Sequence, residues 1–329
     1  MKVCFVYRSR GVSFSIERVF AQIRKHFGGE VEQSECYCPA NSYKNPVSYL
    51  RNFFALRRHN ADIFHITGVV HYAALFYPRN KTVITVHDLG HVFETKGIVG
   101  FFLRRIFAIW PLRWSKNIVA ISEFSKAEIV AKTGVRADKI RVIYDPVFDT
   151  FKYVPKQIDT KCPRILCFAH MKNKNLARHV EALKGVNCTL RVIAKLSDAD
   201  KKMLEESGVR YSVACNLTDA QIVEEYANAD IVLFASTYEG FGVPILEAQS
   251  TGRPIITSNI APMTEVAAAG SAVFVDPFDV QSIRAGVLKI MDTPDLAQKL
   301  VEAGLENTKR FAPEKIAAQY TELYSQILK

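Results

Sequence analysis

The stretch DIVLFASTYEGFGVPILEAQSTG, residues 230–252, joins an apolar run to a glycine-containing loop and a helix-like segment. Its first part, residues 230–236, is apolar on both faces, which is typical of a parallel strand covered by helices. Pro244 is favoured in the first turn of a helix, and Gly252 is favoured just past its end. The stretch therefore predicts a buried strand, a tight loop and a helix, which form part of a βαβ fold.

Similar apolar runs alternate with helix-like segments along the whole chain. They lie at residues 3–7, 62–67, 82–87, 117–122, 141–145, 164–169, 189–194, 210–214, 254–259 and 272–277. This alternation predicts an α/β protein with two doubly wound, Rossmann-like domains. A length of 329 residues suits two domains of ordinary size.

The segment 145–164 mixes prolines, charges and isolated aromatics without either period, so we place the linker there. We expect an N-terminal domain over residues 1–154 and a C-terminal domain over residues 155–329. The tail from Pro294 is expected to be helical, with Pro313 in a first turn, and its last helix is free to pack back on the first domain. Its apolar stripe is Ile316, Ala317, Tyr320, Leu323, Tyr324 and Ile327. Ligands of such sheets bind beyond the carboxyl ends of the strands, so the cleft between the domains is the expected site.

The net charge of +10 is concentrated in the first half of the chain. Residues 1–154 hold 23 Lys and Arg against 12 Asp and Glu, whereas the remainder holds 20 against 21. This asymmetry favours an anionic partner for the first half: a phosphorylated substrate, a membrane surface or nucleic acid. A basic face that serves only solubility is the alternative.

The cysteine pattern and the absence of long apolar runs predict a cytoplasmic protein. The seven cysteines are odd in number and offer no paired zinc knuckle, so reduced thiols are expected. No apolar run reaches the roughly 18 to 20 residues of a membrane span, and the first residues are too short for a secretory signal.

The loop at residues 237–242 has the properties of an anion site. Gly240 and Gly242 are expected to take positive φ, and the following helix start offers unpaired N–H groups. Glu239 and Glu247 are acceptors, which suit the hydroxyl pairs of a sugar or a ribose. Phosphate flanked by hydroxyls describes a nucleotide-sugar, although the two acids could instead only complement the helix dipole.

Residues 236–277 closely resemble the donor-binding half of retaining GT-B glycosyltransferases of family four, which includes many bacterial polysaccharide and lipid-linked glycan enzymes. The family's two glutamates, separated by seven residues, fall on Glu239 and Glu247. Further matches, in the family's order, are residues 14–20, 86–91, 119–129 and 170–183. The resemblance implies a nucleotide-diphosphate sugar as co-substrate, no further cofactor and no metal.

The resemblance also implies roles for residues of the second domain. Glu247 would hold the donor ribose, and Glu239 would lie near the transferred sugar. The backbone of Gly240, Phe241, Gly242 and Val243 would contact the sugar and diphosphate. Lys174 would stabilise charge on the departing diphosphate.

One position departs from the family pattern. Relatives usually carry a second basic residue a few positions before the lysine, and here Met171 occupies that place. Either Lys172 takes over this role or the second charge comes from elsewhere.

In the first domain, the resemblance points to the end of the run at residues 82–87. His87 would touch the donor sugar, and Asp88 would orient it or the acceptor. Gly11 would let its loop approach the diphosphate or the acceptor, and Arg8 and Arg10 would reach the acceptor. A zinc site at His87 and His91 is disfavoured because glycine and a strand end indicate a loop. His65 and His71 are interpreted as packing or hydrogen-bonded residues.

The family's retaining chemistry is usually explained by attack of the acceptor hydroxyl on the face that the diphosphate leaves, so the two-carboxylate scheme of glycoside hydrolases should not be imposed here.

The segment 97–117 mixes large apolar residues with Arg104, Arg105, Arg113 and Lys116, as an interfacial helix at an anionic membrane does. A core-packed helix with a basic outer face is the alternative. We favour a glycan or lipid-linked acceptor at the inner membrane face.

Three other functions fit parts of the sequence. A nucleotide-sugar epimerase or a phosphorylase shares the architecture, but residues 239–244 with Lys174 favour a transferase. A basic nucleic-acid-binding protein would explain the first half and leave the loop from Glu239 to Glu247 without a purpose, so no nucleic-acid partner is expected.

Overall fold

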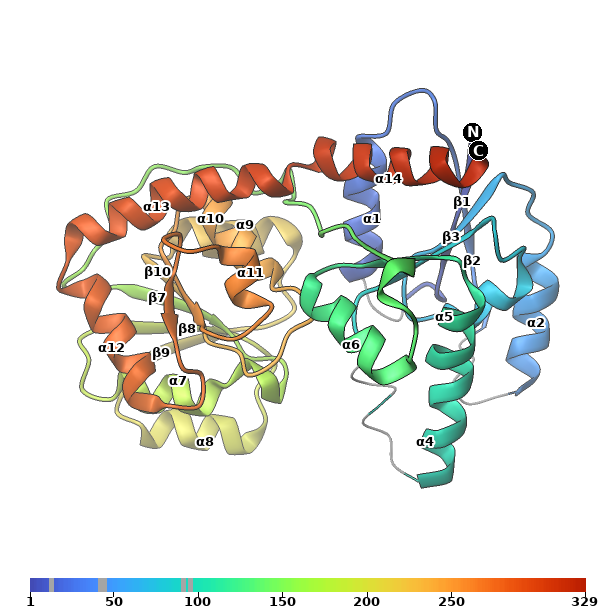
Figure 1. Cartoon of the computed structure of the whole chain (residues 1–329). Helices are drawn as coiled ribbons and strands as arrows, with labels where there is room; N and C mark the ends of the chain where they lie inside the picture. Colours follow the sequence, from blue (N-terminus) through green and yellow to red (C-terminus); the bar gives the residue numbers. More distant parts are fainter. Residues whose placement is uncertain (12–14, 41–45, 90–92, 94–96) are drawn as a thin grey trace. The chain divides into compact units, whose positions relative to one another are not determined.

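The computed structural model of the chain describes residues 1–11, 15–40, 46–89, 93 and 97–329. The chain forms two compact units (Figure 1). Unit 1 comprises Met1–Pro146 with Ala312–Lys329, and unit 2 comprises Val147–Phe311. Each unit contains a six-stranded, wholly parallel sheet, which confirms the expected pair of Rossmann-like folds.

The sheet of unit 1 has the strand order β2-β1-β3-β4-β5-β6. Its strands are β1 (Lys2–Tyr7), β2 (Glu32–Tyr37), β3 (Ile63–Ile66), β4 (Thr82–Val86), β5 (Asn117–Ala120) and β6 (Ile140–Val142). Its helices are α1 (Ser15–Lys25), α2 (Pro46–Leu56), η1 (His71–Phe76), α4 (Gly97–Arg104), η2 (Arg105–Ile109), α5 (Trp110–Trp114), α6 (Glu123–Thr133), η3 (Ala137–Lys139) and α14 (Pro313–Leu328).

Alternate residues of β1 face two different layers of helices. Phe5 packs on Phe20 of α1, with ring centroids 6.1 Å apart. Cys4 and Val6 instead join a core cluster with residues of α2, η1, η2, α5 and α6. Both faces of the sheet are therefore covered, as its apolar strands require.

The sheet of unit 2 has the strand order β12-β11-β10-β7-β8-β9. Its strands are β7 (Arg164–Phe168), β8 (Thr189–Ile193), β9 (Arg210–Ala214), β10 (Ile231–Phe234), β11 (Ile255–Ser258) and β12 (Val273–Val275). Its helices are η4 (Lys172–Lys174), α7 (Leu176–Leu183), α8 (Asp198–Glu206), α9 (Asp219–Asn228), α10 (Val243–Thr251), α11 (Met263–Ala267), α12 (Val280–Met291), α13 (Pro294–Thr308) and η5 (Lys309–Phe311).

The chain order of unit 2 reverses between β7 and β10. From β7 it moves outward through β8 to β9, and from β10 it moves outward on the other side to β12. Figure 1 shows α7, α8 and α12 on one face of this sheet and α9, α10, α11 and α13 on the other. The loops after β7 and β10 meet at this reversal, which is where doubly wound sheets bind ligands.

Every apolar run identified in the sequence coincides with a strand, whereas β2 was not predicted. Its sequence, EQSECY, forms an edge strand with only Cys36 buried. A polar edge strand lacks the two-sided apolar pattern on which the prediction depended.

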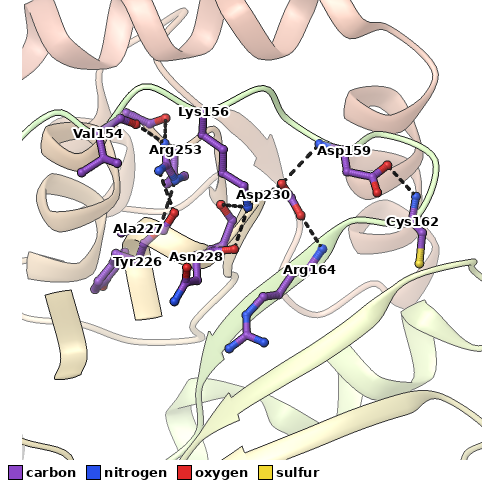
Figure 2. Close-up of polar contacts among 12 residues, drawn as sticks. Val154, Lys156, Asp159, Cys162, Arg164, Tyr226, Ala227, Asn228, Asp230 and Arg253 are labelled. Carbon is purple, nitrogen blue, oxygen red and sulfur yellow. Dashed lines mark hydrogen bonds and ion pairs between the residues drawn. The ribbon is translucent and has the colours of Figure 1, made fainter. Parts of the chain in front are cut away.

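The segment 145–164, in which we placed the linker, is tied to unit 2 over its second half (Figure 2). The buried guanidinium of Arg253 donates to the carbonyl oxygens of Val154, Tyr226 and Ala227 at 2.8–3.1 Å. Asp230 accepts from the backbone N–H groups of Asp159 and Arg164 at 3.2 and 2.8 Å. The Asp230 contacts join the start of β7 to the residue before β10, and the Arg253 contacts join Val154 to the end of α9.

Helix α14 packs beside α1, on the face of the unit 1 sheet that α1 covers. Pro313 begins the helix as expected, and all residues of the expected stripe are buried except Ile327, which is partly exposed. Tyr324 of this stripe contacts buried His65 of β3. The His65 Nδ1 lies 2.6 Å from the Tyr324 hydroxyl, and its Nε2 lies 2.7 Å from the Thr85 hydroxyl.

None of the helices in the described ranges is both long and apolar enough to cross a membrane.

The buried histidines predict a loss of stability in mild acid. Burial lowers the pKa of His65 to about 3 and the pKa values of His71 and His179 to about 4. In the unfolded chain these residues titrate near 6.5. Between these values the unfolded chain binds protons that the folded chain does not, so stability is full above pH 6.5 and falls as the pH drops toward 4. At pH 5.5 each histidine should cost about 1.4 kcal/mol of unfolding free energy relative to pH 7.5.

Urea unfolding at pH 7.5 and 5.5 measures this loss. His65→Gln should reduce the difference between the two pH values, whereas His59→Gln, at an exposed position, should leave it unchanged. An unaltered pH dependence in His65→Gln would remove His65 from the explanation.

Candidate functional site

The loop between β10 and α10 presents a helix start at the strand-order reversal of unit 2. Strand β10 is fully buried, and α10 begins after Gly242, which has a φ of 113°. A side chain at Gly242 would be strained by this φ, and its Cβ would lie 3.1 Å from Ile245 Cδ1. Gly252, with a φ of 76°, ends the helix as expected. Gly240 is not among the described residues with positive φ, so that part of the expectation was wrong.

Lys174 and Glu239 form an ion pair inside this region. Lys174 Nζ donates to Glu239 Oε1 at 2.6 Å, and the two side chains are only 8% and 13% exposed. Nζ also lies 4.7 Å from the centre of the Phe234 ring. The lysine is therefore held at the carboxyl end of β10, with its charge shared between a carboxylate and an aromatic face.

Asn173 holds the β10 loop in place. Its carbonyl oxygen accepts from the Thr237 N–H at 2.9 Å, and its Nδ2 donates to the carbonyl oxygen of Tyr238 at 2.7 Å. Asn175 acts similarly, since its buried Nδ2 donates to the carbonyl oxygens of Ala235 and Pro277. The loops after β7, β10 and β12 are therefore one hydrogen-bonded assembly.

Glu247 is buried on α10 and is oriented by a tyrosine. The hydroxyl of Tyr226, a fully buried residue of α9, donates to Glu247 Oε2 at 2.7 Å. A charge-assisted hydrogen bond of this length fixes the carboxylate direction. The two glutamates therefore lie in different settings, one paired with a lysine and the other with a phenol.

A cavity of about 550 Å³ adjoins this assembly between the loops after β7 and β8. Three basic side chains, Lys172, Arg178 and Lys195, line it together with the single acid Asp200. Arg178 also donates to Asn175 Oδ1 at 3.0 Å and lies 5.7 Å from the ring centre of the exposed Phe278. The cavity has the size and charge for a phosphorylated ligand.

Met171, which stands where relatives usually carry a second basic residue, lines this cavity. It is 61% exposed, and Lys172 lines the cavity beside it. Lys172 is exposed and is therefore free to turn toward a ligand, whereas Lys174 is fixed. Arg178 and Lys195 line the same cavity and are two further candidates for the second charge.

In unit 1, His87 follows β4 and is mostly buried. Its Nε2 lies 3.1 Å from the Thr67 carbonyl oxygen, which can only accept, so Nε2 carries the proton. Its Nδ1 lies 3.7 Å from Asp145 Oδ2. The ring is thus anchored at the carboxyl edge of the sheet, with its side chain 13% exposed.

The other predicted residues of unit 1 lie at the ends of β1 and β4. Arg8 makes a two-pronged ion pair with Glu17 of α1, at 2.9 and 2.8 Å. The Arg10 guanidinium stacks 4.4 Å from the centre of the Tyr37 ring. Gly11 is exposed with a φ of 80°, and Asp88 is exposed.

The remaining histidines of interest are structural. His65 bonds to two hydroxyls, and His71 Nδ1 lies 3.0 Å from the Phe107 carbonyl oxygen, which confirms the interpretation of both as hydrogen-bonded residues. His91 lies outside the described residues. The seven cysteines are free, and no three His, Cys, Asp or Glu side chains of the described part form a metal-binding group.

Several residues of this site were not predicted from the sequence. Asn173 and Asn175 flank the predicted lysine, and their alternation with Lys172 and Lys174 was an available signal. Tyr226 carried no such signal, because a tyrosine on an amphipathic helix is usually a packing residue.

Two family profiles match the chain. The profile described as Glycosyl transferases group 1 matches residues 153–307, and the profile described as Glycosyltransferase Family 4 matches residues 6–149. Together they account for most of the sequence in the order that the resemblance implied.

Two relatives and one solved structure are similar to this chain. The chain is 26% identical to the O-antigen chain mannosyltransferase B of Escherichia coli, over 83% of this chain and 77% of the relative. It is 25% identical to the GDP-mannose:cellobiosyl-diphosphopolyprenol alpha-mannosyltransferase of Komagataeibacter xylinus, over 81% and 72%. The structure of Anabaena Alr3699/HepE with UDP and glucose has the same fold, with a TM-score of 0.79, 17% identity and coverage of 99% and 100%.

The Lys174–Glu239 ion pair predicts non-additive stability effects. Lys174→Met should lower the unfolding free energy by about 3 kcal/mol, because it leaves a mostly buried carboxylate without its cation. Adding Glu239→Gln should recover part of this loss, since the unpaired charge disappears. Urea unfolding of the single and double variants measures the coupling.

Lys201→Met serves as a control. Lys201 pairs with Asp198 at the surface, so breaking this pair should leave the free energy of unfolding nearly unchanged. Strictly additive losses in Lys174→Met and Glu239→Gln would show that the pair has no energetic coupling.

Proposed function

This chain belongs to the group 1 glycosyl transferases of Glycosyltransferase Family 4, and on that premise we propose that it moves a hexose from a nucleotide-diphosphate sugar to a lipid-linked glycan. The family retains the configuration of the transferred sugar and needs no metal. The observation that supports the proposal best is the assembly of Lys174, Glu239 and Glu247 around the start of α10.

The donor diphosphate fits between the start of α10 and Lys174. Unpaired N–H groups and the helix dipole favour an anion there, and Lys174 is held nearby by its bond to Glu239. As the bond to the sugar breaks, negative charge grows on the diphosphate, so a fixed ammonium stabilises the transition state more than the ground state. Glu247, held by Tyr226, accepts from the ribose hydroxyls.

The same contacts bear on the chemical route. Glu239 is bound to the ammonium of Lys174 and to the amide of Asn173 (3.5 Å), which lowers its availability as a nucleophile. This supports attack by the acceptor hydroxyl on the face from which the diphosphate departs, with a leaving-group oxygen taking the proton. Gly240, Phe241, Gly242 and Val243 supply the backbone groups around the sugar in this proposal.

The predicted residues of unit 1 complete the proposal. His87 contacts the donor sugar, and Asp88 orients His87 or the acceptor. Gly11 lets its loop approach the diphosphate or the acceptor, and Arg8 and Arg10 reach the acceptor. For Arg8 this requires partial release from Glu17.

The donor and acceptor classes follow from the relatives. The Komagataeibacter relative is a GDP-mannose enzyme that acts on a diphosphopolyprenol, and the Anabaena structure holds UDP and glucose. We therefore propose a lipid diphosphate as acceptor and rank GDP-mannose before UDP-glucose as donor. Both profiles describe glycosyltransferases, which favours transfer over epimerisation, phosphorolysis or nucleic-acid binding.

An anionic membrane at the inner face is the proposed location of the acceptor. In the segment 97–117, Ile98, Phe101 and Phe102 are 46–78% exposed, and no acid interrupts the four cations. Exposed rings beside arginines suit the headgroup region of a bilayer better than a protein core.

A panel of donors tests the binding site. Thermal unfolding is measured with GDP-mannose, UDP-glucose and an ADP-sugar. The midpoint temperature should rise with the nucleotides of one base only, because a ligand at about a hundred times its dissociation constant adds roughly 2.7 kcal/mol to the unfolding free energy. Failure of every nucleotide to stabilise the protein would contradict a donor seat at α10.

Substitutions test the roles of the residues. Lys174→Ala should lower turnover about 100-fold or more through loss of charge stabilisation, measured as donor consumption with acceptor-containing membranes. Glu247→Gln keeps the shape and one Tyr226 contact but weakens acceptance from the ribose, so it should act mainly on the donor KM.

Lys184→Ala, a surface change outside the site, is the matched control and should retain full activity. Wild-type kinetics in both Lys174→Ala and Glu247→Gln would overturn the assignment of the site.

A further inference from the structure

Among the side chains that the structure describes, nine large apolar ones are exposed on helices of unit 1 that pack beside its sheet. They are Val47, Leu50, Phe54, Leu75, Ile98, Phe101, Phe102, Trp110 and Trp114, on α2, η1, α4 and α5. On α2 the spacing of Val47, Leu50 and Phe54 places all three on one stripe. A soluble surface seldom exposes so many large apolar groups on neighbouring helices unless it meets an apolar partner.

A cavity of about 290 Å³ lies between α2, η1 and η2 within this region. We call it the apolar pocket. Its walls are Tyr49, Leu50, Phe53, Tyr72, Leu75, Phe76 and Ile106. The hydroxyl of Tyr72 accepts from Nδ2 of the buried Asn52 at 2.8 Å, so it is already satisfied within the protein. Walls of aromatic and aliphatic carbon favour a hydrocarbon over a polar ligand.

Two segments that contribute to the apolar pocket carry cations and no acid. Residues 46–58 contain Arg51, Arg57 and Arg58 and no acid, and residues 97–117 likewise contain cations and no acid. Arg57 lies over the ring of Phe53, a wall residue, with 5.2 Å between the guanidinium carbon and the ring centre. Arg105 lies over Phe101 in the same way, at 4.6 Å. The occupant should therefore be apolar along its length and anionic at one end.

We propose that the apolar pocket binds the hydrocarbon chain of the lipid acceptor next to its phosphate, with the arginines of the same segments, Arg57 first, at the phosphate. The inference rests on the proposed function, since it assigns the lipid part of that acceptor to a site. A bilayer touching only the outer helices would not use the interior of the pocket. The pocket therefore makes unit 1 select a lipid phosphate with a long chain.

Two alkyl phosphates with one headgroup serve as probes. Isothermal titration below the micelle concentration should show dodecyl phosphate binding at one molecule per chain, and butyl phosphate should bind at least tenfold more weakly. Leu50→Glu and Leu75→Glu each place a carboxylate at the apolar pocket, from α2 and from η1, and both positions are exposed enough to tolerate it. Each should weaken dodecyl phosphate at least tenfold.

Phe54→Glu is the matched control, because Phe54 is 64% exposed on the same helix but is not a wall residue. It should retain dodecyl phosphate binding while weakening attachment to vesicles of phosphatidylglycerol and phosphatidylcholine. The pocket would be rejected if Phe54→Glu and Leu50→Glu weakened the affinity for dodecyl phosphate equally, or if neither weakened it. In that case the exposed helices would serve only as a membrane surface.

Donor hydrolysis without lipid separates this inference from the proposed function. Wild type, Leu50→Glu and Leu75→Glu should consume the donor equally, since none of the changes touches unit 2. If the protein uses a donor but Leu50→Glu and Leu75→Glu bind dodecyl phosphate as well as wild type does, the pocket inference is rejected and the proposed function stands. Pocket-dependent binding without use of any donor would reject the proposed function alone.

Discussion

The buried guanidinium of Arg253 is the contact on which the donor side of the molecule depends. It lies directly after α10, and its hydrogen bonds reach the carbonyl oxygens of Val154 before β7 and of Tyr226 and Ala227 at the end of α9. Burial lowers the pKa of this arginine from its usual value, yet a guanidinium stays charged because its ordinary pKa lies so high. Carbonyl oxygens satisfy the charge, so one side chain joins three segments that are distant in sequence.

The position of Glu247 follows from this arrangement. Arg253 holds the backbone of Tyr226, and the hydroxyl of the same tyrosine holds Glu247. The carboxylate therefore derives its direction from the packing of α9 against α10 rather than from the loop beside it. Glu239 depends on different contacts, through Asn173 and Lys174 in the loop after β7. The two glutamates share a sequence motif, but separate parts of the fold position them.

The sequence predicted the α/β architecture well because buried parallel strands are apolar on both faces, as DIVLFAS at residues 230–236 illustrates. It did not predict β2, whose edge position leaves most of its side chains exposed. For the site, Lys174, Glu239 and Glu247 were identified because they lie within contiguous motifs. Tyr226 was not, since its role depends on the tertiary meeting of two helices. The expected positive φ of Gly240 was wrong because Gly242 alone provides that turn before α10. How His87 relates to the donor remains a prediction, because it depends on how the two units meet.

The two tryptophans of the chain, Trp110 and Trp114, both belong to the short helix α5 of unit 1 and are about half exposed. Indole emission therefore comes entirely from the surface assigned to lipid, and unit 2 contributes none. The protein carries an intrinsic optical probe whose colour reports the polarity around α5. A blue shift would mark the transfer of these rings from water to a less polar medium, without any attached label.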